Sequence, residues 1–162
     1  MSVLCCEEID VSSLRELLKQ FGMELHLLES KQEIPGSWFG EPEAGIIQNT
    51  LYVRPDTPVH SALHESCHYI CMSDDRRRTL HTNAGGDYDE ENAVCFLSIL
   101  LSDYLTDFGR QRMFDDMDAW GYTFRSGSSR DWFEEDAADA EQWLIEQHLI
   151  KTDHTPCWRV RK

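Results

Sequence analysis

Two histidines four positions apart, with a glutamate directly after the first, form the sequence pattern with the clearest chemistry. Residues 64–68 read His-Glu-Ser-Cys-His, which is an H-E-x-x-H motif. On a helix these two imidazoles share one face about 6 Å apart along the axis, so both can reach one ion. Imidazole nitrogen is a preferred zinc ligand. Glu65 would sit beside the ion and accept a proton from a metal-bound water, whose pKa zinc lowers to about 7. His64, Glu65 and His68 therefore predict a zinc site suited to hydrolysing a carbonyl compound.

A catalytic zinc needs a third protein ligand and an open position. Glu90 and Glu91 open a strongly apolar segment downstream of the motif. Glu90 is in helical register with Ala93 and Leu97 of the expected buried stripe, whereas Glu91 lies at the edge of that stripe. If the stripe packs against the motif helix, Glu90 points at the metal. We therefore rank Glu90 first as the third ligand and keep Glu91 as the alternative.

Two further residues are weaker candidates for the third ligand. His60 shares the helix face of the motif but lies two turns before His68, about 12 Å away along the axis, which one ion cannot bridge. Asp74 stands where some zincins place a ligand, yet Cys71 occupies the position of the glycine that their turn requires. We expect His60 to begin the helix or to support the site from outside the ligand set.

The reaction also needs a donor for the developing oxyanion. Tyr88 and His81 lie in the segment that links the two metal-binding stretches, and either is a candidate. The alternatives are that Tyr88 packs beside the start of the following helix and that His81 is exposed in a loop.

The charge of the chain excludes some partners. Its 162 residues include 15 Lys plus Arg and 30 Asp plus Glu, which gives a net charge of −15. Nucleic-acid phosphates and anionic membranes would be repelled, so we expect neither as a partner. A hydrophobic content of 41% and this length predict one globular domain, residues 1–162.

The cellular compartment is predicted from three features that the sequence lacks. No apolar run is long enough to span a bilayer, and residues 1–10 have no basic start typical of a signal peptide. The 6 cysteines show no paired framework spacing. These features predict a cytoplasmic protein with reduced thiols.

Several elements are expected around the motif. Ser13 and Glu16 form a capping box for a helix that ends near Gly22. Strands are expected at 23–29 and 46–53, and helices at about 57–72, 89–106 and 131–149, with loops or turns at 35–45, 73–78 and 81–88.

Two stretches resemble the ImmA/IrrE-type metallopeptidases. Residues 51–53 (LYV), a short loop and residues 62–68 (ALHESCH) are similar to the strand, loop and zinc helix of that family. Residues 90–101 (EENAVCFLSILL) resemble its E-x-E-A-N-x-F-A-x-x-L-L motif, in the register that makes Glu90 the ligand. The chain departs from the pattern at Ser66 and Cys67, at Asn92, and at Val94, which cannot orient a zinc-bound imidazole.

The resemblance covers roughly residues 44–105, the expected metal core, and leaves a helical part at about 107–162 without a counterpart. It implies an α+β, zincin-like fold in which a small antiparallel or mixed sheet packs on a helix bundle containing the motif helix. It also implies a Zn²⁺-dependent endopeptidase that acts on a specific protein or peptide, in better-known members a helix-turn-helix repressor, bound as a strand at an exposed sheet edge. Two alternatives stay open: a zinc-containing interaction module without proteolytic activity, and a zinc amidase acting on a small molecule.

Overall fold

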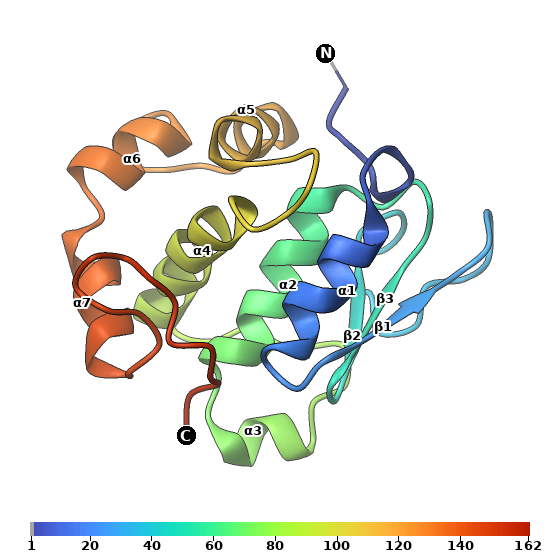
Figure 1. The fold of residues 1–162 in the computed structure, drawn as a ribbon, viewed down its shortest axis with the longest axis horizontal. Coiled ribbons are helices and arrows are strands. Elements are labelled where there is room, and N and C mark those ends of the chain that lie inside the picture. Colours follow the sequence, from blue (N-terminus) through green and yellow to red (C-terminus); the bar gives the residue numbers. More distant parts are fainter. Residues whose placement is uncertain (1) are drawn as a thin grey trace.

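A small mixed sheet lies at one side of the molecule. The computed structural model describes residues 2–162, and within them the sheet has strands β1 (Glu24–Leu27), β2 (Gly45–Ile47) and β3 (Thr50–Val53) in the order β1-β3-β2 (Figure 1). The central strand β3 runs parallel to β1 and antiparallel to β2. The strand expected at 46–53 is therefore two strands. Gln48 adopts a positive φ of 51°, which turns the chain, and the β-forming residues on both sides concealed this turn in the sequence.

The motif helix, α2 (Val59–Cys71), follows β3 through a short capped loop. The hydroxyl of Thr57 accepts a hydrogen bond from the Arg54 N–H at 2.9 Å, and Pro58 occupies the capping position instead of the first helical position. Almost every residue of α2 is buried, because the sheet covers one side and a second long helix covers another. The motif is thus carried on a rigid element.

That second helix, α4 (Tyr88–Ser102), packs along α2 and carries both candidate glutamates. It begins one residue earlier than expected, because the side chain of Asp87 caps it by accepting the Glu90 N–H at 2.9 Å. It ends at Ser102, short of the expected limit. The first turn of α4 therefore lies directly over the motif.

The N-terminal part packs against β1 and the start of α2. A short 3₁₀ helix (Cys6–Glu8) precedes α1 (Val11–Lys19), which packs on β1. The capping box expected at Ser13 is wrong: Asp10 caps α1, and its carboxylate accepts the Ser12 N–H at 3.0 Å.

The remaining helices surround α4. The expected charged turn at 73–78 contains α3 (Asp74–Arg78). On the side of α4 away from the sheet lie α5 (Arg110–Trp120), α6 (Ser129–Glu135) and α7 (Ala138–Glu146) (Figure 1). The single helix expected at 131–149 is broken after α6, where Asp136 leaves the helical conformation.

One apolar cluster fills the space between these elements. It runs from Cys6 to Ile150 and includes the fully buried side chains of Leu63 and Phe96 from α2 and α4. The fold is α+β, as the sequence predicted. No helix within residues 2–162 combines the length and the apolar character that crossing a bilayer requires.

Candidate metal centre

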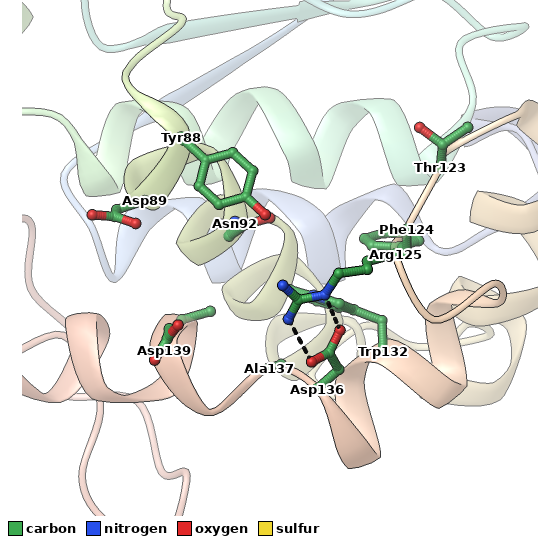
Figure 2. A pocket seen from close by; sticks show the side chains of 11 residues that line it. Tyr88, Asp89, Asn92, Thr123, Phe124, Arg125, Trp132, Asp136, Ala137 and Asp139 are labelled. Carbon is green, nitrogen blue, oxygen red and sulfur yellow. Dashed lines mark hydrogen bonds and ion pairs between the residues drawn. The ribbon is translucent and has the colours of Figure 1, made fainter.

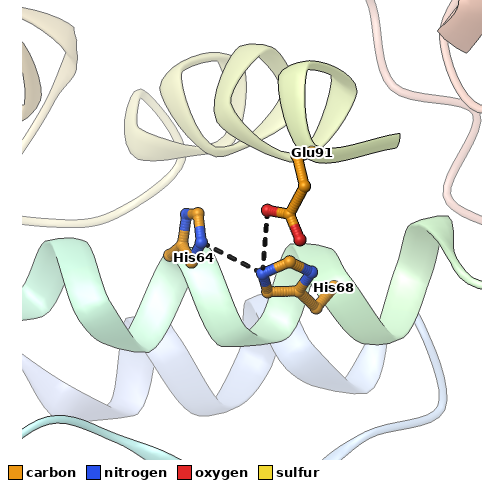
Figure 3. A group of neighbouring side chains, drawn as sticks. All are labelled: His64, His68 and Glu91. Carbon is orange, nitrogen blue, oxygen red and sulfur yellow. Dashed lines mark hydrogen bonds and ion pairs between the residues drawn. The ribbon is translucent and has the colours of Figure 1, made fainter. Parts of the chain in front are cut away.

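Three side chains from two helices converge on one point. His64 and His68 project from α2, and Glu91 reaches toward them from α4 (Figure 3). The Nε2 atoms of the two histidines are 3.0 Å apart, and Oε2 of Glu91 is 3.6 Å from Nε2 of His68. One ligand atom from each residue lies within 4.8 Å of the other two. The arrangement brings together two neutral nitrogen donors and one carboxylate.

The spacing of these atoms can be compared with that around a tetrahedral zinc ion. Ligand atoms at about 2.0–2.1 Å from such an ion lie about 3.3 Å from one another. The distances of 3.0 Å and 3.6 Å fall on either side of this value. Two of the three separations thus lie near the tetrahedral value and the third is within 4.8 Å, so the three residues could hold a metal ion, and their nitrogen and oxygen donors are of the kind that zinc accepts.

The Glu91 carboxylate is held by the loop before α4. Its Oε1 accepts the backbone N–H of Gly86 at 3.1 Å, while Oε2 is the oxygen nearer to His68. The side chain is 40% exposed, and burial nevertheless raises its pKa, while the Gly86 N–H and Arg76 act in the opposite direction. One carboxylate oxygen is thus fixed and the other is free for an ion.

Glu90, ranked first in the sequence analysis, does not face the histidines. It is buried, as the stripe predicted, but its Oε2 pairs with Arg76 at 2.7 Å and with Arg161 at 3.3 Å. In this structure the alternative, Glu91, groups with the two histidines, and Glu90 does not. The apolar stripe correctly predicted that the Glu90 side chain is buried, but it did not reveal which part of the chain packs over it.

The cover over Glu90 comes from α3 and the C-terminal segment. Arg76 lies on α3 and also donates to the Gly85 carbonyl at 3.0 Å. The backbone N–H of Arg161 donates to the carbonyl of Ile70 at 2.9 Å, which attaches the tail to the end of α2. Two cations from distant parts of the chain thus contact Oε2 of the carboxylate that the sequence analysis ranked first, while its Oε1 is buried without a hydrogen-bond partner among residues 2–162.

Both histidines are held in the neutral form. Burial lowers the pKa of His64 to about 4, and burial, His64 and Arg76 all lower the pKa of His68. Neutral imidazole is the form that binds metals. Neither Nδ1 atom has a hydrogen-bond partner within residues 2–162. Val94 has no polar group that could orient the imidazole rings. The rings are therefore held by packing between α2 and α4.

Glu65 lines the same small cavity, of about 80 Å³, as the two histidines. It is 5% exposed, and its pKa is raised to about 8 by burial and by the nearby carboxylates of Glu43 and Glu91. A dication at this point would reverse that effect and favour the ionised carboxylate. The cavity thus combines a buried acid with the two candidate nitrogen ligands.

The two predicted oxyanion donors lie elsewhere. Tyr88 is 74% exposed and lines a separate cavity of about 310 Å³, whose far wall contains the ion pair of Arg125 with Asp136 (Figure 2). Its position follows from the early start of α4, which places Tyr88 in the first turn on the outer face. His81 is exposed, and its Nδ1 lies 2.8 Å from the Thr82 hydroxyl. The structure does not bring either residue to the metal centre.

A tyrosine that sequence reasoning missed lies beside the centre instead. The Tyr122 ring meets that of His64 edge-on at 5.7 Å, and its hydroxyl is 3.1 Å from Nδ1 of His60. Burial raises its pKa well above the usual value, so the phenol keeps its proton. Tyr122 arrives there because α5 ends at Gly121, whose φ of 104° turns the chain toward α2. No motif links the chain after α5 to α2, and the single hint was an aromatic cluster near 120.

His60 has the supporting position expected for it. It is fully buried between Tyr122 and Trp120, and burial and His64 lower its pKa to about 3. Trp120 in turn donates its indole N–H to Glu43 at 3.2 Å. The end of α5 is therefore packed against the site through two aromatic residues.

Comparisons with known proteins found no match. The chain matches no protein-family model, no curated protein and no solved structure.

Proposed function

We propose that this protein is a zinc-dependent endopeptidase with a zincin-like arrangement of its two metal helices. The observation that carries the proposal is the convergence of His64, His68 and Glu91 beside a buried acid, Glu65, in one cavity. Two histidine ligands, one carboxylate ligand and a separate acid are the minimal set for hydrolysis by metal-activated water.

His64 and His68 would hold the ion through Nε2, and Glu91 would hold it through the oxygen that Gly86 leaves free. Zinc, when bound, supplies a Lewis acid and lowers the pKa of its water to about 7. The sequence resemblance placed Glu90 in this role. The contacts of Glu90 with Arg76 and Arg161 favour its neighbour instead.

Glu65 is the proposed general base. It would take a proton from the attacking water and pass it to the leaving amine. Its position beside His64 and its burial suit that task, because a buried carboxyl group binds the proton between the two transfers with little competition from bulk water.

Tyr122 replaces Tyr88 and His81 as the proposed donor to the oxyanion. It is protonated at neutral pH and lies beside His64. In this scheme the hydroxyl exchanges its hydrogen bond with His60 for one with the reacting oxygen. The segment that follows α5 would thus contribute directly to the reaction.

A peptide suits the cavity better than a small molecule does. The cavity is small, and its edge is formed by Trp38 and Phe39, both largely exposed. An enclosed pocket that surrounds most of its ligand, as expected for a small-molecule amidase, is not found around the histidines in the described part of the chain. All 6 cysteines are free thiols, which supports a reducing compartment such as the cytoplasm.

The test combines metal analysis with peptide cleavage. Purified wild-type protein is expected to bind one zinc per chain and to cleave a protein or peptide pool, whereas His64→Ala loses the zinc. Glu65→Gln should keep the zinc but lose activity by about 1,000-fold or more, since the base is absent.

Two outcomes separate the alternatives. Zinc bound by the wild type without cleavage of any peptide in the pool would favour the interaction module. A protein free of zinc, and unchanged by His64→Ala, would exclude the metal centre altogether.

A further inference from the structure

Two adjacent aromatic side chains stand unburied at the edge of the candidate centre. Trp38 is 57% exposed and Phe39 is 67% exposed, and both line the cavity that contains His64 and Glu91. Aromatic side chains of this size each bury about 150–250 Å² when covered. Leaving two of them in water beside a reaction centre is costly unless a ligand covers them.

The segment that carries them is attached at both ends. On one side the Gly36 carbonyl accepts the N–H of Ile46 at 3.1 Å, and on the other Glu41 pairs with Arg54 at 3.0 Å. The Ser37 hydroxyl closes the segment by donating to the Glu43 carbonyl at 3.0 Å. The aromatic pair is thus presented on an anchored loop, which lowers the entropic cost of binding.

The same loop also hinders a peptide from binding as an added strand of the sheet. β2 is the edge strand that packs against α2, so a peptide added as a strand would pair with it. Ile46 of β2 already donates to Gly36, and its carbonyl already accepts the N–H of Thr82 at 3.0 Å. The strand addition that the family resemblance implied is therefore blocked at Ile46 on β2, the edge strand beside the motif helix, and side-chain contacts carry more of the binding there.

The formally charged side chains that line the cavity are all acidic. Its lining includes Glu65 and Glu91 but, among residues 2–162, neither lysine nor arginine. The net charge of −15 adds to this field. A bound dication would balance these two carboxylates, so selectivity at this edge is set by the apolar surface that Trp38 and Phe39 offer to a substrate side chain.

Resting on the proposed function, we infer that Trp38 and Phe39 form the specificity site for a peptide substrate, which they engage through a large apolar side chain next to the bond that is cut.

The experiment measures peptide binding without requiring cleavage. The Glu65→Gln protein is titrated calorimetrically with decapeptides of alanine, serine and glycine that carry one central phenylalanine or alanine. We expect the phenylalanine peptide to bind at least 10-fold more tightly than the alanine peptide, a difference of about 1.4 kcal/mol or more, because its large apolar side chain is covered by the aromatic pair.

The preference should depend on the aromatic pair. In a Trp38→Ala/Phe39→Ala variant of the same protein, the preference for phenylalanine is expected to fall below 3-fold. Leu27→Ala is the matched control, because Leu27 is 45% exposed but lines a different cavity. It should retain the full preference, and zinc content should be equal in all variants.

A preference that survives in the double variant, or the absence of binding by the phenylalanine peptide, would overturn the inference. These results are independent of catalysis. A protein that selects the phenylalanine peptide but cuts nothing would support the specificity site and contradict the peptidase, whereas one that cleaves peptides without regard to Trp38 and Phe39 would do the reverse.

Discussion

Glu90 and Glu91 are neighbours in the chain but lie in opposite electrostatic surroundings. Glu90 faces Arg76 and Arg161, which place two guanidinium groups on one carboxylate. Glu91 faces two neutral imidazoles and lies near the carboxyl group of Glu65. The carboxylate on one side of the first turn of α4 is thus ion-paired with two arginines, whereas the carboxylate on the other side has no arginine partner among residues 2–162.

The difference indicates where an ion is needed. A buried carboxylate with two arginines has its charge compensated, and breaking those pairs to bind a metal would leave the arginines unpaired. The carboxyl groups beside the histidines form no ion pair with a lysine or arginine of the described chain, and burial raises the pKa values of both Glu65 and Glu91. A dication would supply the missing charge on that side.

The largest effect is expected on zinc affinity. Glu91→Gln should weaken zinc binding about 1,000-fold, or about 4 kcal/mol, because a charged ligand is lost. Glu90→Gln has the same shape and charge change one residue away, and it should weaken binding by less than about 10-fold. Competition with a chromophoric chelator measures both. A larger loss in Glu90→Gln would mean that the two roles are exchanged, and equal losses would contradict the assignment of Glu91 as the ligand.

The next effect concerns the pH dependence of the metal-free protein. Burial raises the pKa of Glu65 to about 8 in the folded chain, from about 4.5 for a glutamate in water. Its contribution to stability is therefore complete below pH 4.5 and is lost as the pH rises through 8, because the unfolded chain releases that proton earlier. Glu65→Gln cannot ionise and avoids this loss. We expect it to be more stable than the wild type by roughly 2–3 kcal/mol at pH 8.5, with little advantage at pH 5.

Urea unfolding in the presence of a chelator measures this difference. Glu90→Gln is the control, because Arg76 and Arg161 lose their partner at either pH, so its effect is a destabilisation at both. Saturating zinc should abolish the advantage of Glu65→Gln. An advantage that is the same at pH 5 and pH 8.5 would contradict the raised pKa.

The sequence predicted the parts of the site that depend on local geometry. The spacing of His64 and His68 on one helix, with Glu65 beside them, requires only the period of an α-helix. The α+β class was expected from the resemblance to the ImmA/IrrE-type metallopeptidases, and the helices and small sheet of the structure agree with it at that level. The choice between Glu90 and Glu91 depended on what packs on each side of α4, and α4 is buried on several sides. Its apolar pattern therefore could not tell the face toward α2 from the face toward Arg76.

Two features of the site could not be predicted because they depend on contacts between segments that are distant in the sequence. Tyr122 meets His60 and His64 because Gly121 ends α5 over α2, and Arg161 reaches Glu90 because the tail is attached to Ile70. Neither contact has a local pattern. The hairpin at Gln48 was missed for the opposite reason, since its flanking residues favour strand so strongly that they hid the turn.

The smallest predicted effect tests the position of Glu90 directly. A Cβ added to Gly86 would lie 2.4 Å from the Glu90 carboxyl carbon, whereas one added to Gly85 would meet its nearest atom at 3.4 Å. Gly86→Ala must therefore displace a side chain held by two arginines, which should cost about 1–2 kcal/mol of unfolding free energy. Gly85→Ala should change stability by less than about 0.5 kcal/mol. Urea unfolding of the two variants compares them, and equal stabilities would show that Glu90 does not occupy the space beside Gly86. The backbone N–H of Gly86 also donates to the Glu91 carboxylate. A zinc titration of Gly86→Ala therefore reports whether displacing the Glu90 side chain also weakens zinc binding through Glu91.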